Sequence, residues 1–370
     1  MRQESAGIPK RSASGNKLAR TEFSFDDSSL SVALVGGGGF VGSHLLRELL
    51  VRTRWKILVV DLDFHRVEDV LRQKKPNVEF LCADIARTEV ADRVSRCDIV
   101  VNLAAICTPS RYMGEARAVI ESNFTHPARL AEMCAREGSW LIYFSTSEVY
   151  GKTRADSDVL DEDASDFVLG PVSASRWSYA AAKQLSERFI ASLPNFHYSI
   201  VRPFNFIGPW MDFMPGVDGE GIPRVLASFS SALVRNEPMV LVNEGRARRT
   251  FTAIEDAVEF MFCLFRNSKT AYGNAFNVGN SRNELSILEL AVLMRRIYAK
   301  MKSVEESSLP PFRKLSGEEF YGKGYEDSMR RVPSVEKAKR LLGFEAKVSI
   351  ECALKRSLLW FDAHYGAKEK

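Results

Sequence analysis

Short apolar runs alternate with longer amphipathic segments from about residue 30 to residue 201. The apolar runs predict strands at residues 32–35, 56–60, 78–81, 99–103, 141–144 and 198–201. The segments between them include two whose apolar spacing predicts helices, at residues 41–51 and 116–137. Because strands separated by helices pair in parallel, the pattern predicts an α/β fold with a doubly wound parallel sheet.

The pattern changes at both ends of this region. Residues 1–28 are rich in Ser, Arg, Lys and Gly, which predicts a disordered lead and a fold that begins near Ser29. After residue 203 the alternation loosens and the loops become rich in Gly and Pro. We therefore expect a large domain of residues 29–203 plus 250–272, and a smaller C-terminal lobe of residues 204–249 plus 273–365 that holds the substrate.

A late helix is predicted at residues 335–342. Ser334 stands before it as a candidate N-cap, and Gly343 stands after it as a candidate C-terminal stop.

Composition narrows the class of protein. The 370 residues are 45% hydrophobic and carry a formal net charge of +4, with lysine and arginine scattered along the chain, so no nucleic-acid footprint is evident. No apolar stretch approaches the ~18 residues of a membrane span. The six cysteines form no C-x-x-C pair, which favours a reducing cytosol. We expect a cytoplasmic globular enzyme without a bound metal.

A glycine run follows the first predicted strand. Gly36, Gly39 and Gly42 form a G-x-x-G-x-x-G pattern, with Phe40 and Val41 opening the next helix. Such a turn brings backbone close to a pyrophosphate at a helix N-terminus, although four successive glycines could also be only a flexible turn. Asp61 ends the second strand about 20 residues later, where a carboxylate binds the ribose hydroxyls of NAD. The combination favours an NAD site.

Two further strand ends fit the same cofactor. Asp84 closes the third strand, where it could bind the adenine edge while Ile85 packs on the ring. Leu103 and Ala104 end the fourth strand in a stretch of small residues, as needed where backbone lies against a cofactor.

The candidate reacting centre is Tyr179 with Lys183. Four residues apart on a helix, the two side chains share one face, so the ammonium and an oxidised nicotinamide can lower the pKa of the phenol and make it a usable base. A Tyr-x-x-x-Lys pair also occurs by chance on solvated helices. The run 145–148 at the end of the fifth predicted strand supplies three hydroxyls and a carboxylate nearby, including Thr146, Ser147 and Glu148.

Together these motifs, with the run 202–205, resemble the extended short-chain dehydrogenase/reductase family over nearly all of residues 29–365. The resemblance implies an NAD-binding Rossmann domain in which Tyr179 and Lys183 pass a proton while NAD takes hydride from a sugar carbon. It implies that Thr146 hydrogen-bonds the substrate hydroxyl, and that Asn205 and Arg249 contact the nucleotide diphosphate. It also implies a homodimer formed through the helices at residues 116–137 and 179–193.

Other stretches resemble one branch of that family more narrowly. Residues 107–109, 176–179, 211–219, 223–225 and 321–327 are similar to the UDP-apiose/UDP-xylose synthases and, more distantly, to the dehydrogenase domain of polymyxin-resistance enzymes. Both groups act on UDP-glucuronic acid. The likeness implies a UDP-sugar substrate, oxidation at C4 and loss of carbon dioxide.

This narrower likeness assigns further site residues. Arg331 stands where those enzymes hold an arginine near the sugar carboxylate, and Arg176 could share that task by bidentate pairing. Glu148 and Ser147 could manage protons at C5. Arg224 and Tyr325 lie in the matching stretches and are expected to bind substrate.

One departure leaves the product open. Ser147 stands where the apiose synthases have cysteine, yet Cys107 of those enzymes is kept, either as a catalytic thiol or as a packing residue beside the cofactor. The expected products are therefore UDP-4-keto-pentose, UDP-xylose or UDP-apiose. Two alternatives remain: an epimerase or dehydratase acting on another nucleotide sugar, and a catalytically silent dinucleotide sensor.

Overall fold

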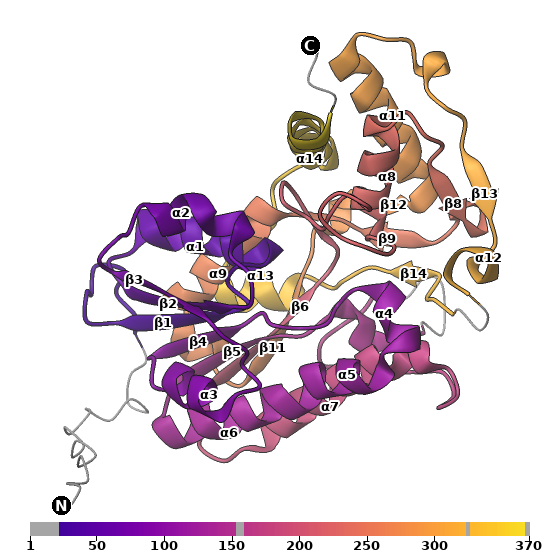
Figure 1. Cartoon of the computed structure of the whole chain (residues 1–370). Helices are drawn as coiled ribbons and strands as arrows, with labels where there is room; N and C mark the ends of the chain where they lie inside the picture. Colours follow the sequence, from indigo (N-terminus) through magenta and orange to yellow (C-terminus); the bar gives the residue numbers. More distant parts are fainter. Residues whose placement is uncertain (1–21, 153–158, 323–325, 367–370) are drawn as a thin grey trace, which may run out of the picture.

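A seven-stranded, entirely parallel sheet forms the centre of the protein. The computed structural model describes residues 22–152, 159–322 and 326–366 (Figure 1). The strand order is β11-β6-β5-β4-β1-β2-β3, and every neighbouring pair is parallel. The strands are β1 (Ser31–Val35), β2 (Lys56–Asp61), β3 (Val78–Cys82), β4 (Ile99–Asn102), β5 (Trp140–Phe144), β6 (Tyr198–Pro203) and β11 (Asn274–Val278). The predicted doubly wound sheet is confirmed.

Helices cover both faces of this sheet (Figure 1). On one face α1 (Phe40–Arg52) packs against α9 (Ile254–Arg266), and on the other α3 (Thr88–Ser95) packs against α6 (His126–Glu137), which contacts α7 (Ser178–Ser192). Alternate residues of β1 enter different cores: Val32 and Leu34 one, Ala33 and Val35 the other. This alternation is what the two-sided burial of a parallel sheet requires.

The helix predicted at residues 116–137 is present but not uniform. It consists of α5 (Ala116–Ile120), a π-helical segment at Glu121–Thr125 and α6. Asn123 in this segment is buried, and its side chain donates to the carbonyl oxygen of Ile106 in the loop that follows β4.

A smaller lobe stands over the carboxyl ends of the strands (Figure 1). It contains α8 (Val225–Val234), α11 (Ile287–Lys302) and α14 (Ile350–Tyr365), which pack on one another. Short strand pairs complete it: β9 (Arg248–Thr250) lies between β12 (Glu284–Ser286) and β14 (Arg330–Arg331), and β8 (Val240–Val242) pairs with β13 (Arg313–Leu315).

The predicted domain division assigned residues 273–365 to the smaller lobe. This is wrong for β11, because that strand belongs to the central sheet. This strand reads Asn-Ala-Phe-Asn-Val, so its polar residues hide it from an apolar-run search. Asn277 is nonetheless fully buried, because its amide donates to the carbonyl oxygen of Leu160 and accepts from the Tyr150 hydroxyl. A buried amide with its partners supplied is as acceptable in a sheet as an apolar residue. The other bounds of the division stay a prediction.

The fold also begins earlier than predicted. Residues 22–28 were expected to belong to a disordered lead, but Phe23 is buried against Trp140, with ring centroids 5.4 Å apart. Phe25 packs edge-on against Trp55 and Phe262. These two aromatic residues anchor an otherwise polar segment, because each buries a large apolar area.

The late helix, α13 (Glu336–Leu342), confirms one predicted end and corrects the other. Gly343 ends it in the left-handed conformation with φ +64°. Its N-cap is Val335, which makes no side-chain capping hydrogen bond. The backbone N–H of Ser334 instead donates to the carbonyl oxygen of Leu160, so Ser334 does not cap the helix.

Within the described ranges no helix is long and apolar enough to cross a membrane. The same ranges hold no group of three or more His, Cys, Asp or Glu side chains that could bind a metal ion.

Candidate active site

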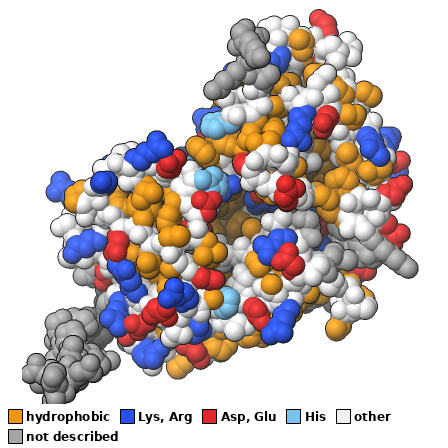
Figure 2. Space-filling model, viewed as in Figure 1, with side chains coloured by type: hydrophobic (Ala, Val, Ile, Leu, Met, Phe, Trp, Pro, Cys, Tyr) orange, Lys and Arg blue, Asp and Glu red, His pale blue; other side chains and the backbone are white. Residues whose placement is uncertain are grey.

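A cavity of about 1330 Å³ lies between the sheet's carboxyl edge and the lobe, and Figure 2 shows the surface hollowed there. The expected site residues come together in it from both parts of the chain. Tyr325 lies outside the described residues. The residues lining the cavity include Gly36, Gly39, Phe40, Val41, Gly42, Asp61, Asp84, Ile85, Leu103, Ala104, Cys107, Thr146, Ser147, Glu148, Arg176, Tyr179, Lys183, Asn205, Arg224, Arg249 and Arg331.

The glycine run forms a tight strand-to-helix turn. Gly36 has φ +83°, and a Cβ there would lie 2.7 Å from the backbone nitrogen of Ala104. Gly39 is the N-cap of α1 and has no side-chain capping group, so the first amides of the helix remain available to an anion. Sequence reasoning missed Gly38, where a Cβ would collide with the carbonyl oxygen of Asp63 at 2.0 Å.

Gly36→Ala is predicted to weaken NAD binding roughly tenfold. The added Cβ forces a shift of either the turn or the Leu103–Ala104 backbone, and the strain, about 1–3 kcal/mol, moves the amides away from their aligned position. Titration of the protein with NAD measures the effect. Gly114→Ala is the matched control, because a Cβ there meets nothing within 4 Å. Unchanged NAD affinity in Gly36→Ala would contradict the cradle.

The acidic residues predicted for the adenosine end lie at the expected strand ends. Asp61 closes β2, and its carboxylate accepts from the backbone N–H of Gly38 at 2.8 Å and of Leu62 at 2.7 Å. Burial raises its pKa. Asp84 is exposed and accepts from the backbone N–H of Ala86. Both carboxylates therefore face the cavity from anchored turns.

Tyr179 and Lys183 lie one turn apart on α7, as predicted. Both are buried, at 5% and 1% exposure. Thr146 interacts with the Tyr179 hydroxyl and opposes the rise of its pKa, and Lys183 Nζ donates to the carbonyl oxygen of Phe144 at 2.7 Å. The ring of Tyr179 stacks on Tyr112, with centroids 4.7 Å apart. The strand-end hydroxyl and the helix pair thus form one cluster.

The side chains of the protein alone do not lower the pKa of the Tyr179 phenol as expected. Burial, with the nearby Cys107 and Glu148, raises the pKa of Tyr179 well above its usual value instead of lowering it. Burial also lowers the pKa of Lys183 to about 8. Desolvation dominates here because both side chains are almost fully buried. The positive charge of an oxidised nicotinamide is left to favour the phenolate.

The lowered pKa of Lys183 predicts that the activity depends on pH. Below pH 8 the Lys183 side chain is an ammonium, which donates to the carbonyl oxygen of Phe144 and favours the phenolate of Tyr179. Above pH 8 that positive charge is lost. We expect kcat/KM to fall as the pH rises through about 8. A profile from pH 6 to 10 in constant-ionic-strength buffer tests this, and activity that still rises between pH 8 and 10 would contradict it.

Three buried arginines form ion pairs with two carboxylates in the same cavity as Tyr179. Arg176 contacts Glu148 at 2.7 Å and Asp327 at 3.4 Å, and Arg249 contacts Asp327 at 2.7 Å. Arg331 lies 3.6 Å from Glu148 and 3.4 Å from Asp327. The arginines hold the pKa of both carboxyls below their usual range against the opposing effect of burial.

This cluster carries one net positive charge and one unsatisfied donor. Nε of Arg331 is buried without a hydrogen-bond partner among the described residues. An orphaned charged donor is costly unless a ligand supplies the acceptor, so the cluster fits an anionic group. Asp327 was not predicted as a site residue, although it lies four residues before Arg331, within a stretch that the resemblance covers.

Arg249 and Asn205 were expected together at a diphosphate. Arg249 belongs to the arginine cluster, while Asn205 donates to the carbonyl oxygen of Thr250 at 2.9 Å. Both line the cavity, and their contact with a diphosphate stays a proposal.

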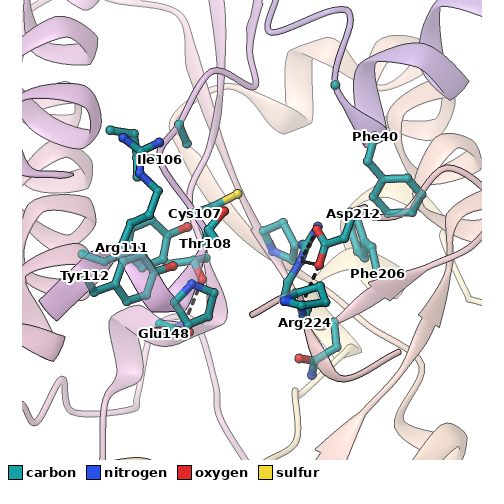
Figure 3. Close-up of a pocket in the computed structure, with 18 of the residues that line it drawn as sticks. Phe40, Ile106, Cys107, Thr108, Arg111, Tyr112, Glu148, Phe206, Asp212 and Arg224 are labelled. Atoms are coloured by element: carbon teal, nitrogen blue, oxygen red, sulfur yellow. Dashed lines mark hydrogen bonds and ion pairs between the residues drawn. The ribbon is translucent and has the colours of Figure 1, made fainter. Parts of the chain in front are cut away.

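The remaining expected residues lie across the cavity from each other (Figure 3). Cys107 is exposed on one side, and Arg224 is paired with Asp212 on the other. Ser147 is buried beside Glu148. The thiol therefore faces open space in the cavity.

A dinucleotide cradle joined to a Tyr-Lys pair at the carboxyl edge of a parallel sheet is the arrangement of an NAD-dependent enzyme. More specifically, the chain belongs to the NAD dependent epimerase/dehydratase family, whose model matches residues 32–279.

Several relatives match most of the chain. It is 39% identical over 359 residues to UDP-D-apiose/UDP-D-xylose synthase 2 of Arabidopsis thaliana, covering 91% of this chain and 92% of that protein. It is 30% identical to the bifunctional polymyxin resistance protein ArnA of Wigglesworthia glossinidia brevipalpis, covering 94% of this chain and 53% of that protein. The crystal structure of the PbgP3 protein of Burkholderia pseudomallei superimposes with a TM-score of 0.79 and 29% identity, covering 90% of this chain and 97% of that one.

Proposed function

We propose that the protein is an NAD-dependent oxidative decarboxylase of UDP-glucuronic acid. The observation that carries the proposal is the net positive arginine cluster, with its orphaned Arg331 Nε, beside the Tyr179–Lys183 pair. A hexuronic acid carries its carboxylate on C5, which is the neighbour of C4, the carbon whose hydroxyl is to be oxidised. The name of the UDP-D-apiose/UDP-D-xylose synthase that matches most of the chain supports a UDP-sugar as the ligand class.

The residues divide the chemistry between them. The glycine turn and Asp61 would hold NAD, which supplies a hydride acceptor for C4. Tyr179 takes the proton of the C4 hydroxyl while Thr146 orients that hydroxyl, and Lys183 stabilises the phenolate. Oxidation makes a β-keto acid, so the bond from C5 to the carboxylate can break with its electron pair moving into the new carbonyl.

The arginine cluster positions the group that leaves. Arg331 and Arg176 hold the carboxylate by charge-assisted hydrogen bonds until carbon dioxide departs. Loss of carbon dioxide leaves an enolate, which takes up a proton at C5. The Ser147 hydroxyl would relay that proton from water, and Glu148, which both arginines keep ionised, would accept it on the way. Arg224, Arg249, Asn205 and Tyr325 are proposed to bind the nucleotide part of the substrate.

Incubation with UDP-glucuronic acid and NAD tests the proposal. We expect release of carbon dioxide and a UDP-pentose or UDP-4-keto-pentose, which mass and NMR analysis distinguish as xylose, apiose or ketose. A product that keeps all six sugar carbons would instead identify an epimerase or dehydratase. No consumption of the substrate would overturn the proposal.

We also propose a homodimer in the cytosol. The helices predicted for the interface lie side by side, since α5 and the π-helical segment both pack on α7. They expose Ile120 at 41% and Leu185 at 49%. The free cysteines support a reducing compartment. Sedimentation analysis should give twice the chain mass, and Leu185→Glu should give the monomer; a monomeric wild type would refute the dimer.

A further inference from the structure

A tight turn at the edge of the cavity holds two non-glycine residues in the left-handed region. The turn runs from Pro209 to Asp212, with φ +67° at Trp210 and +58° at Asp212. Residues with a Cβ adopt this conformation at a cost in free energy. Contacts from outside the turn must therefore hold it.

Side chains from the cofactor-binding part make these contacts. Arg66, in the 3₁₀ segment η2 (His65–Val67), donates from Nε to the carbonyl oxygen of Trp210 at 3.0 Å and from Nη2 to that of Asp212 at 2.7 Å. His44, on α1, contacts the carbonyl oxygen of Pro209 at 2.9 Å. The planar guanidinium of Arg66 presents both donors in a fixed geometry, so it bonds the two strained residues at once.

The same turn fixes a cationic side chain in the cavity. The partly buried carboxylate of Asp212 accepts from the backbone N–H of Arg224 at 2.7 Å and from its Nε at 3.0 Å (Figure 3). The pair holds the pKa of Asp212 below its usual value. Asp212 thus joins Arg66, through its backbone, to Arg224, through its side chain.

The other end of this connection lies at the cofactor. Arg66 follows Asp61 by five residues, and both line the cavity. A dinucleotide held through its ribose by Asp61 would restrict the segment that carries Arg66. We propose that Arg66 is a positioning residue that couples the two ligands: bound dinucleotide steadies its hold on the turn, and the turn sets Arg224 for the diphosphate of the nucleotide sugar. The coupling rests on the proposed function.

A four-part binding cycle tests the coupling, with UDP as the probe. Calorimetry would measure UDP affinity for the protein stripped of NAD and for the protein saturated with it. For the wild type we expect NAD to tighten UDP binding about tenfold, within the usual range of couplings between sites. Arg66→Met should reduce this factor below about twofold. A merely structural role would weaken UDP binding equally in both states, and an unchanged factor would overturn the proposal.

Two further variants sharpen the experiment. Arg72→Met is the matched control, because Arg72 is exposed and pairs only with Glu68 among the described residues; it should keep the wild-type factor. Arg66→Lys keeps the charge should Arg66→Met not fold, and its single ammonium cannot hold both carbonyls, so it should lose most of the coupling. Retention of the full factor by Arg66→Lys overturns the proposal.

Failure of the two proposals is distinguishable. Wild-type protein that binds NAD but not UDP overturns the proposed function. Wild-type protein that binds UDP equally with and without NAD overturns only the role of Arg66.

Discussion

Tyr179→Phe should lower kcat for UDP-glucuronic acid about 1000-fold, in the middle of the range for losing a general acid–base group. The phenol is buried and interacts with Thr146, and Lys183 lies one turn further along α7. The ring keeps its stacking on Tyr112 when only the hydroxyl is removed. NAD affinity and KM should therefore change by less than about threefold, since the loss falls on the transition state.

Tyr198→Phe is the matched control for this variant. Tyr198 begins β6 at the amino edge of the sheet, and its hydroxyl reaches only the carbonyl oxygen of Gly273, at 3.4 Å, among the described residues. Its kcat should equal that of the wild type. Steady-state assays of carbon dioxide release with both variants decide the matter. A Tyr179→Phe enzyme with more than a tenth of the wild-type kcat would mean that another group moves the proton.

The sheet could be predicted because its central strands are buried on both faces. Such strands must be nearly continuous apolar runs, and β1, β2, β4 and β5 are. β11 escaped because Asn277 satisfies its amide through Leu160 and Tyr150, which are more than 110 residues away along the chain. Burial that depends on distant partners leaves no local periodic signal.

The residues of the candidate site also divide into those that the sequence predicts and those that it does not. Residues at strand ends and at fixed helical spacing could be predicted, because topology alone brings Gly36, Asp61, Thr146 and Tyr179 to one edge. Asp327 could not, since its importance arises from three arginines contributed by separate segments of the chain. The direction of the Tyr179 pKa also could not, because spacing gives the position of Lys183 and says nothing of desolvation.

Arg331→Ala is the second large effect, and we expect it to lower kcat/KM for UDP-glucuronic acid about 100-fold, equivalent to about 2.7 kcal/mol. The variant removes the only arginine in the described cluster whose Nε is left without an acceptor, and with it the fork that suits a carboxylate. Affinity for NAD and for UDP should stay within about twofold, because neither ligand presents the sugar carboxylate. The contrast between UDP-glucuronic acid and UDP is the informative readout.

Arg330→Ala provides a control at the neighbouring position of the same strand. Arg330 is outside the cavity lining and donates from Nε and Nη2 to Glu284, each at 2.9 Å, so its loss removes a comparable ion pair without touching the cluster. Its kcat/KM should stay within about twofold of the wild type, with both variants checked for equal unfolding temperature. If Arg331→Ala weakens NAD binding as much as it slows decarboxylation, then Arg331 supports the fold of the cavity and the carboxylate must be held by Arg176 alone. Glu148 and Asp327 accept hydrogen bonds from the arginines of the cluster. Selectivity for the uronic acid therefore depends on which arginine still has a donor without an acceptor.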